Sequence, residues 1–259
     1  MSRRNLPTCA SLATDQGRRY FLLGVVNGAT VCVSAPMLAL TAEQPAFALP
    51  KEVAGVRLPD TLLAQAAVDL ARAASPGSLF RHCMRTYLFG AMLAEVNNVS
   101  YDQEMIFVAA ALHDLGLTSL YTTPDHTFEV DGANAAKEFL ASRGATEARA
   151  ELVWNAIALH TSPLIDHQAP QVGLVGSGAG ADVFASQLSL LRTERVRAVV
   201  KTFPRGSFNM EFRDLLVVHC QRKPFSQQGT WLDGFCRAHN PGLTYPDLET
   251  RLLSTHFPG

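Results

Sequence analysis

The 259-residue sequence has few charged side chains and no concentrated charge of one sign. Asp, Glu, Lys and Arg make up 17% of the residues, and the formal net charge is -1. There is no basic run and no stripe of Lys or Arg, which argues against a nucleic-acid-binding protein. Tandem repeats and low-complexity tracts are also absent. By contrast, 47% of the residues are hydrophobic, which suits one globular domain with a sizeable core.

Two common catalytic or nucleotide-binding motifs are missing as well. No Gly-x-Ser-x-Gly nucleophile elbow occurs in the sequence. Gly176, Gly178 and Gly180 resemble a phosphate-binding loop only superficially, because no strand precedes them and no Lys-Ser/Thr pair follows. We interpret these glycines as small residues that let two helices approach closely.

Cysteines are too few for a full disulfide framework. Cys83, Cys220 and Cys236 lie beyond the N-terminal segment, and an odd number leaves at least one thiol unpaired. Cys220 and Cys236 could pair in an oxidising compartment, or all three could be buried free thiols. The sequence leaves both alternatives open.

The first 48 residues are predicted to be an export signal rather than part of the fold. Arg18 and Arg19 precede an uncharged apolar stretch, and Ala46–Ala48 has the small-x-small pattern of a signal-peptidase site. The paired arginines resemble the bacterial twin-arginine signal, although Gly17 stands where Ser or Thr is usual. We therefore expect a cleaved signal and a periplasmic protein. The alternative is an uncleaved segment that tethers the protein to the membrane, facing the periplasm.

Residues 49–259 are predicted to form one all-α domain with little or no sheet. Alternation of period two is scarce, whereas helical patterns bounded by capping or breaking residues recur. We expect Ser78 and Ser100 to be helix N-caps, and Gly116 to end a helix as a left-handed residue. The expected helices are 60–74, one after Ser78, one from Ser100 into His113, 127–143, one after Thr146, 171–186, 193–203, 208–222 and 230–238.

Two histidines and two aspartates are candidate ligands of a divalent metal. His113 and Asp114 end one predicted helix, His82 lies on the helix before it, and Asp182 lies on a later one. Adjacent helical residues point about 100° apart, but the last turn before Gly116 can relax so that both face one ion. An ion with an open position can generate hydroxide near neutral pH. The competing interpretation makes Asp182 a helix-capping or salt-bridging carboxylate.

Four further residues are candidate catalytic groups at this centre. His160 and His126 could act as acid or base, bind the substrate or hold a second metal, or they could be ordinary histidines near helix ends. Glu129 and Asp131 could orient a ligand imidazole or the attacking water. Alternatively, both are first-turn acids favoured by the helix dipole.

Arg81 and Arg85 flank His82 and are candidate substrate-binding residues for an anion. The alternative is that they pair with Glu95 or Asp114. We expect the aromatic side chains of this region, which are Phe80, Tyr87, Phe128 and Trp154, to belong to the core rather than to stack on a substrate.

The order His82, His113-Asp114 and Asp182 resembles the HD-domain superfamily of metal-dependent hydrolases. Longer runs resemble its cyanamide hydratase-like branch, and the likeness covers roughly residues 58–240. These runs are residues 79–87, the Leu-His-Asp-Leu-Gly core, and residues 126–134, 154–161 and 178–184. The resemblance implies a helical HD-domain bundle, one divalent metal that is commonly zinc and sometimes iron or manganese, and hydration of a small nitrile such as cyanamide to urea.

We therefore predict an enzyme that adds metal-activated water to a small nitrile-type substrate, with zinc as the first expectation and iron(II) or manganese as alternatives. The alternative function is hydrolysis of a phosphomonoester or nucleotide by the same metal. A third hypothesis is a non-enzymatic helical module with structural histidines. We expect a small-molecule substrate, no nucleic-acid partner and no stable membrane span after signal cleavage. Homo-oligomerisation stays open.

Overall fold

The computed structural model describes residues 24–26, 29–31, 49–163, 165, 168–246 and 248–254. The chain divides into two compact units, Met1–Ala48 and Leu49–Gly259. In the first unit the described residues form one antiparallel pair, β1 (Gly24–Val26) and β2 (Ala29–Val31). The rest of the predicted export signal lies outside the described residues. No described helix is long and apolar enough to cross a membrane.

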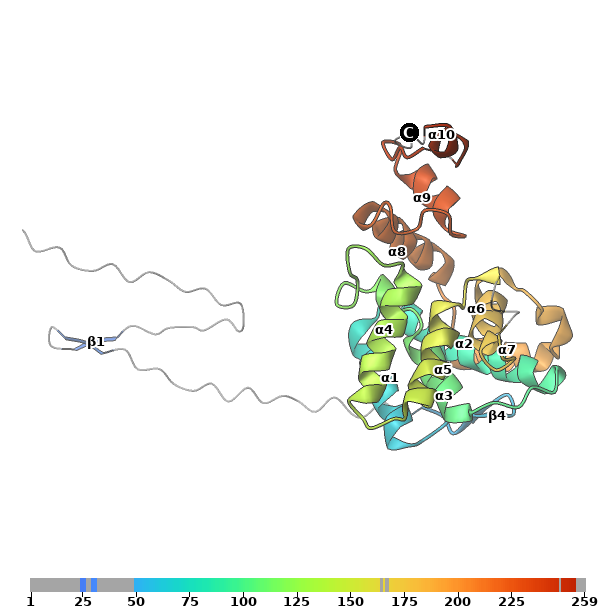
Figure 1. Cartoon of the computed structure of the whole chain (residues 1–259). Helices are drawn as coiled ribbons and strands as arrows, with labels where there is room; N and C mark the ends of the chain where they lie inside the picture. Colours follow the sequence, from blue (N-terminus) through green and yellow to red (C-terminus); the bar gives the residue numbers. More distant parts are fainter. Residues whose placement is uncertain are drawn as a thin grey trace, which may run out of the picture. The chain divides into compact units, whose positions relative to one another are not determined.

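The second unit is helical, which confirms the predicted all-α class (Figure 1). Its described sheet is one short antiparallel pair, β3 (Glu52–Val53) and β4 (Val56–Arg57). The helices are α1 (Leu62–Ala74), α2 (Gly77–Val96), α3 (Gln103–Leu112), η1 (Leu115–Leu117), α4 (Phe128–Ala141), α5 (Glu147–Ala158), α6 (Gly173–Phe184), η3 (Leu188–Leu190), α7 (Thr193–Thr202), α8 (Phe208–Arg222), α9 (Asp233–His239) and α10 (Leu248–Leu253).

Helix α2 lies at the centre of the core and packs closely against α6. Every residue from Ser78 to Ala94 is buried except the half-buried Arg81. A Cβ atom added at Gly178 of α6 would lie 2.0 Å from the carbonyl oxygen of Thr86 in α2. The predicted role of this glycine in close helix packing is therefore confirmed. The close approach brings the end of α6, which carries Asp182, beside α2.

Two predicted helix caps are wrong. Ser78 lies inside α2, because that helix already begins at Gly77 after Pro76. The cap of α3 is Asp102 rather than Ser100, because the Asp102 carboxylate accepts a hydrogen bond from the backbone nitrogen of Met105 at 3.1 Å. The predicted cap at Thr146, by contrast, is confirmed by α5.

Gly116 has a different role from the one predicted. It lies within η1 and does not have a positive φ angle. A Cβ atom at Gly116 would lie only 2.0 Å from the carbonyl oxygen of Phe128, at the start of α4. The glycine therefore allows η1 to pack against α4, directly after His113 and Asp114.

A second, smaller core joins α8 and α9 to the start of α2, to η1 and to the start of α4. Among the described residues, its buried members are Leu79, Leu117, Phe128, Phe208, Phe212, Leu216, Cys220, Leu232 and Cys236. Cys220 and Cys236 form a disulfide between α8 and α9, with their Cα atoms 5.0 Å apart. Cys83 is free and buried. Of the two alternatives left open by the sequence, the structure contains the disulfide.

Candidate metal centre

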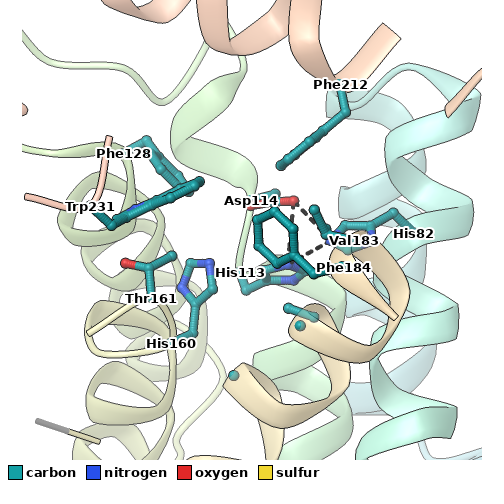
Figure 2. A pocket seen from close by; sticks show the side chains of 13 residues that line it. His82, His113, Asp114, Phe128, His160, Thr161, Val183, Phe184, Phe212 and Trp231 are labelled. Carbon is teal, nitrogen blue, oxygen red and sulfur yellow. Dashed lines mark hydrogen bonds and ion pairs between the residues drawn. The ribbon is translucent and has the colours of Figure 1, made fainter. Parts of the chain in front are cut away.

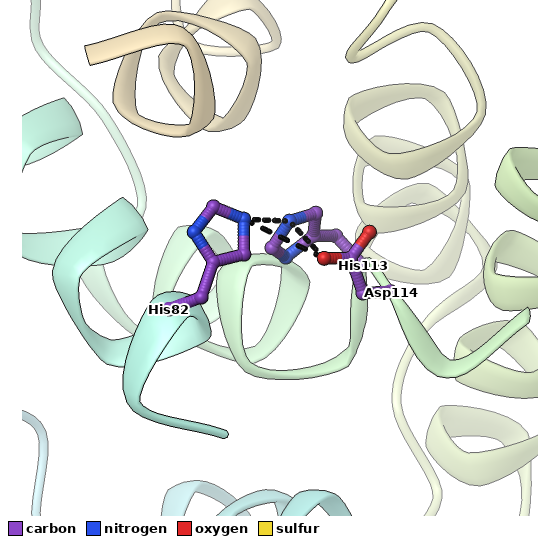
Figure 3. A group of neighbouring side chains, drawn as sticks. All are labelled: His82, His113 and Asp114. Atoms are coloured by element: carbon purple, nitrogen blue, oxygen red, sulfur yellow. Dashed lines mark hydrogen bonds and ion pairs between the residues drawn. The ribbon is translucent and has the colours of Figure 1, made fainter. Parts of the chain in front are cut away.

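Three of the predicted metal ligands meet at one point (Figure 3). His82 comes from α2, His113 is the C-cap of α3, and Asp114 stands directly before η1. The Nε2 atoms of His82 and His113 lie 3.3 Å apart. The Oδ2 atom of Asp114 lies 3.5 Å from the first nitrogen and 3.3 Å from the second. All three side chains are almost completely buried, with at most 2% of the side chain exposed.

The spacing of these three atoms fits a bound divalent ion. Donor atoms about 2.1 Å from an ion with tetrahedral geometry lie about 3.4 Å from one another. The three measured separations, 3.3 to 3.5 Å, match that value. Catalytic zinc sites often have three protein ligands, for example two imidazoles and one carboxylate, and keep a fourth position for water or substrate.

The Asp114 carboxylate gives a second reason to expect a cation. Its Oδ2 atom is buried and has no hydrogen-bond partner among the described residues. A buried carboxylate oxygen without a partner is costly, because it has lost its hydration without replacement. A metal ion between this oxygen and the two imidazoles would satisfy it.

Each of the three histidine rings directs its Nδ1 atom to a hydrogen-bond acceptor. Nδ1 of His82 donates to Asp182 at 2.7 Å. Nδ1 of His113 donates to the carbonyl oxygen of Ala110 at 2.8 Å, and Nδ1 of His160 donates to that of Ile157 at 2.7 Å. These acceptors cannot donate a hydrogen bond, so Nδ1 must carry a proton in each ring. The neutral form of each ring therefore has its lone pair on Nε2.

Asp182, the fourth predicted ligand, lies behind His82 rather than in the group of three. Its carboxylate accepts hydrogen bonds from His82 and, at 2.7 Å each, from Nε and Nη2 of Arg85. Arg205 also donates to this carboxylate. In this arrangement Asp182 orients the His82 ring, as outer partners of metal ligands commonly do. The sequence left a salt-bridging Asp182 as the competing interpretation, and these contacts correspond to it.

The three grouped residues have strongly shifted pKa values. Burial favours neutral rings, and it lowers the pKa of His82. Burial also opposes a charge on His113, but the adjacent Asp114 carboxylate raises the pKa of His113 well above its usual range. The two histidines in turn hold the pKa of Asp114 below its usual range despite its burial. The group thus favours a positive charge at its centre, which a divalent cation would supply.

The group opens on a pocket of about 310 Å³ (Figure 2). His160 lines it beside His113, and the centroids of the two rings are 5.0 Å apart. The remaining wall is mostly apolar. It is formed by Phe128, Thr161, Gly176, Ala179, Gly180, Val183, Phe184, Phe212 and Trp231. Phe128, which the sequence placed in the core, is buried but also contributes to this wall.

Glu129 lies behind the pocket wall, where it holds two of the lining residues. Its Oε1 atom accepts hydrogen bonds from Oγ1 of Thr161 at 2.7 Å and from Nε1 of Trp231 at 2.9 Å. Its Oε2 atom is buried without a hydrogen-bond partner among the described residues. Glu129 is thus placed to position the wall and to accept one more hydrogen bond.

The structure does not bring the other two candidate catalytic residues to the pocket. Asp131 accepts from the backbone nitrogen of Thr123 at 2.8 Å and from Nζ of Lys223 at 2.5 Å, which makes a buried ion pair. The His126 side chain is 52% exposed and lies 3.5 Å from Asp131. Neither Asp131 nor His126 is among the residues that line the pocket.

The two arginines predicted to bind substrate are also engaged elsewhere. Arg85 is fully buried and forms its ion pair with Asp182, not with Glu95 or Asp114. Arg81 donates to the carbonyl oxygen of Pro204 at 2.8 Å. Neither arginine lines the pocket.

Sequence reasoning missed Phe212 and Trp231 as pocket residues. Both come from the C-terminal part of the described chain, on a ribbon separate from those that carry the three grouped residues (Figure 2). No local motif marks either position. Only the packing of the second core shows that they reach the pocket.

Residues 79–182 match the HD domain family. The matched stretch begins near the start of α2 and ends at Asp182, so it includes the three grouped residues and His160 but not α7 to α10. No curated protein matches the chain. The family match and the buried His/Asp group together indicate a divalent metal site and a metal-dependent hydrolase.

Proposed function

We propose that this chain, with its HD domain at residues 79–182, adds water to a small nitrile-type compound such as cyanamide. The observation that carries the proposal is the buried group of His82, His113 and Asp114, which opens on a small apolar pocket. One bound divalent ion, for which we propose zinc, would supply hydroxide near neutral pH.

His82, His113 and Asp114 would hold this ion through Nε2, Nε2 and Oδ2. Asp182 would fix the orientation of the His82 ring, because it accepts a hydrogen bond from the Nδ1–H group of that ring. Replacement of Asp182 therefore affects the metal through His82.

His160 is the residue that we assign to proton transfer. Its Nδ1–H group donates a hydrogen bond to the carbonyl oxygen of Ile157, so its Nε2 lone pair is available beside His113. Burial lowers the pKa of His160, which keeps the ring neutral and able to accept a proton at pH 7. Glu129 holds Thr161 and Trp231 around the substrate. We do not extend this role to Asp131 or His126, which lie outside the pocket wall.

The lining of the pocket favours a small neutral substrate over a phosphate ester. In the part of the chain that the structure describes, no Lys or Arg lines it, whereas phosphate sites usually present such cations. Arg85 and Arg205, which approach the site, are both paired with Asp182.

We also propose that residues 1–48 export the protein to the periplasm. The disulfide between Cys220 and Cys236 supports this proposal, because such bonds persist in oxidising compartments. Cell fractionation with N-terminal sequencing tests it. A full-length protein in the membrane fraction would favour the tethered alternative, and a cytoplasmic protein would reject both.

The proposed reaction is tested with purified protein whose metal content is measured by elemental analysis. We expect urea to form from cyanamide in proportion to bound metal, and Asp114→Asn to abolish it. Metal-loaded protein that converts no member of a panel of small nitriles would reject the nitrile proposal. Release of phosphate from p-nitrophenyl phosphate or nucleotides would favour the phosphohydrolase instead.

A further inference from the structure

A cap from outside the HD domain completes the pocket. The HD match ends at Asp182, yet Phe212 of α8 and Trp231, just before α9, both line the cavity. We call residues 203–239 the cap. The HD domain supplies the grouped ligands and His160, whereas the cap supplies two large aromatic side chains of the wall (Figure 2).

The cap is held on the HD domain by buried contacts at several points. The Phe208 ring stacks on His82 with a centroid distance of 4.8 Å. Lys223, 3% exposed, forms a buried ion pair with Asp131 of α4. Within the cap, the disulfide joins Cys220 to Cys236, and Trp231 lies in the segment that this bond closes. The cap is therefore a fixed part of the pocket.

Trp231 combines an exposed position with a buried anchor. The residue is 41% exposed, so apolar packing alone would leave its orientation weakly determined. Its Nε1 nevertheless donates to the buried carboxylate of Glu129, which also holds Thr161. A hydrogen bond of 2.9 Å to this buried acceptor fixes the rotamer of the indole. The ring is thus held at the edge of the cavity.

We propose that Trp231, anchored by Glu129, is the specificity-determining residue of this site and sets the largest ligand that can reach the metal group. The inference rests on the proposed metal-dependent function. Small neutral ligands pass the indole, and ligands with an added ring collide with it. The discrimination comes from the cap and not from the HD domain.

The first test uses cobalt(II)-loaded protein and two probes that coordinate through one nitrogen, imidazole and 4-phenylimidazole. Changes in the visible cobalt spectrum report their binding. We expect the wild-type protein to favour imidazole, and Trp231→Ala to reduce that preference by on the order of tenfold. Trp154→Phe is the control, because Trp154 does not line the pocket and donates its hydrogen bond to Asn134. An unchanged preference in W231A overturns the proposal.

The second test needs no metal. The sequence has two tryptophans, so in W154F the fluorescence comes from Trp231 alone. Adding Glu129→Leu removes the acceptor of the indole. We expect stronger quenching by acrylamide and a red shift of the emission, and identical quenching would refute the anchor. Failure to take up cobalt would count against the proposed function, while the quenching result would still decide the anchor.

Discussion

Two buried aspartates at this site have opposite surroundings. Asp114 has one oxygen without a hydrogen-bond partner among the described residues, facing two imidazole nitrogens. Asp182 accepts from His82, Arg85 and Arg205. Both carboxylates have pKa values below their usual range, although burial alone would raise them. A carboxylate oxygen without a hydrogen-bond partner beside two imidazole nitrogens can bind a cation. A carboxylate paired with two arginines instead holds other side chains in place.

The largest expected effect is the loss of metal on Asp114→Asn. The amide retains the shape but not the charge of the carboxylate, so we expect metal affinity to fall by more than about 100-fold, beyond the usual effect of an outer partner. Calorimetric titration with zinc measures the affinity. Wild-type affinity in D114N would show that this carboxylate is not a ligand.

Asp182→Asn should weaken metal binding less but destabilise the fold more. Loss of an outer partner of a metal ligand costs about 10–100-fold in affinity. The variant also leaves the fully buried Arg85 without its counter-charge, which costs about 3–5 kcal/mol in the free energy of unfolding. Urea denaturation of metal-free protein measures this loss. A drop in affinity equal to that of D114N would make Asp182 a direct ligand.

Lys223→Met is a matched test of a buried ion pair that lies outside the metal group. It leaves Asp131 without its ammonium partner, and we expect a loss of about 3–5 kcal/mol in the free energy of unfolding. Zinc affinity should stay at the wild-type value. The double variant D131N/K223M should recover part of the lost stability. A large loss of zinc affinity in K223M would mean that any destabilisation disturbs the site, which would remove the contrast between Asp114 and Asp182.

The smallest effect depends on pH and concerns His219, a buried imidazole outside the group. Burial, helped by the positive charge of Lys223, lowers the pKa of His219 from 6.5 to about 4. The unfolded chain therefore takes up this proton first as the pH falls. The stability contributed by the neutral ring is complete above pH 6.5 and is lost between about pH 6.5 and 4, by about 3 kcal/mol.

Denaturation of the wild-type protein and of His219→Gln across this pH range isolates the contribution of His219. The stability of H219Q should fall less steeply with acidification. Parallel curves would mean that the ring titrates near its ordinary value. The comparison is needed because His82 and His160 are also buried with lowered pKa values.

Much of the fold could be predicted because helical periodicity and capping are local properties. The all-α class and the helix N-cap at Thr146 follow from residues within one or two turns of each other. The predicted role of Gly116 is wrong because a glycine is needed there for close contact with Phe128, which belongs to another helix. The helix N-cap predicted at Ser100 is wrong because Asp102, two residues later, caps the helix instead. Both residue types are good N-caps, and a single sequence does not show which one is used.

The sequence by itself determined the residue types of the metal group and their order along the chain, because His82, His113 and Asp114 lie on or beside strongly helical segments. The tertiary structure decided which aspartate keeps an oxygen without a hydrogen-bond partner, namely Asp114 rather than Asp182. His82 meets Asp182 across 100 positions of sequence, and Trp231 meets Glu129 across 102. Such contacts depend on how α6 and the cap pack on α2 and α4, and no local spacing encodes that packing.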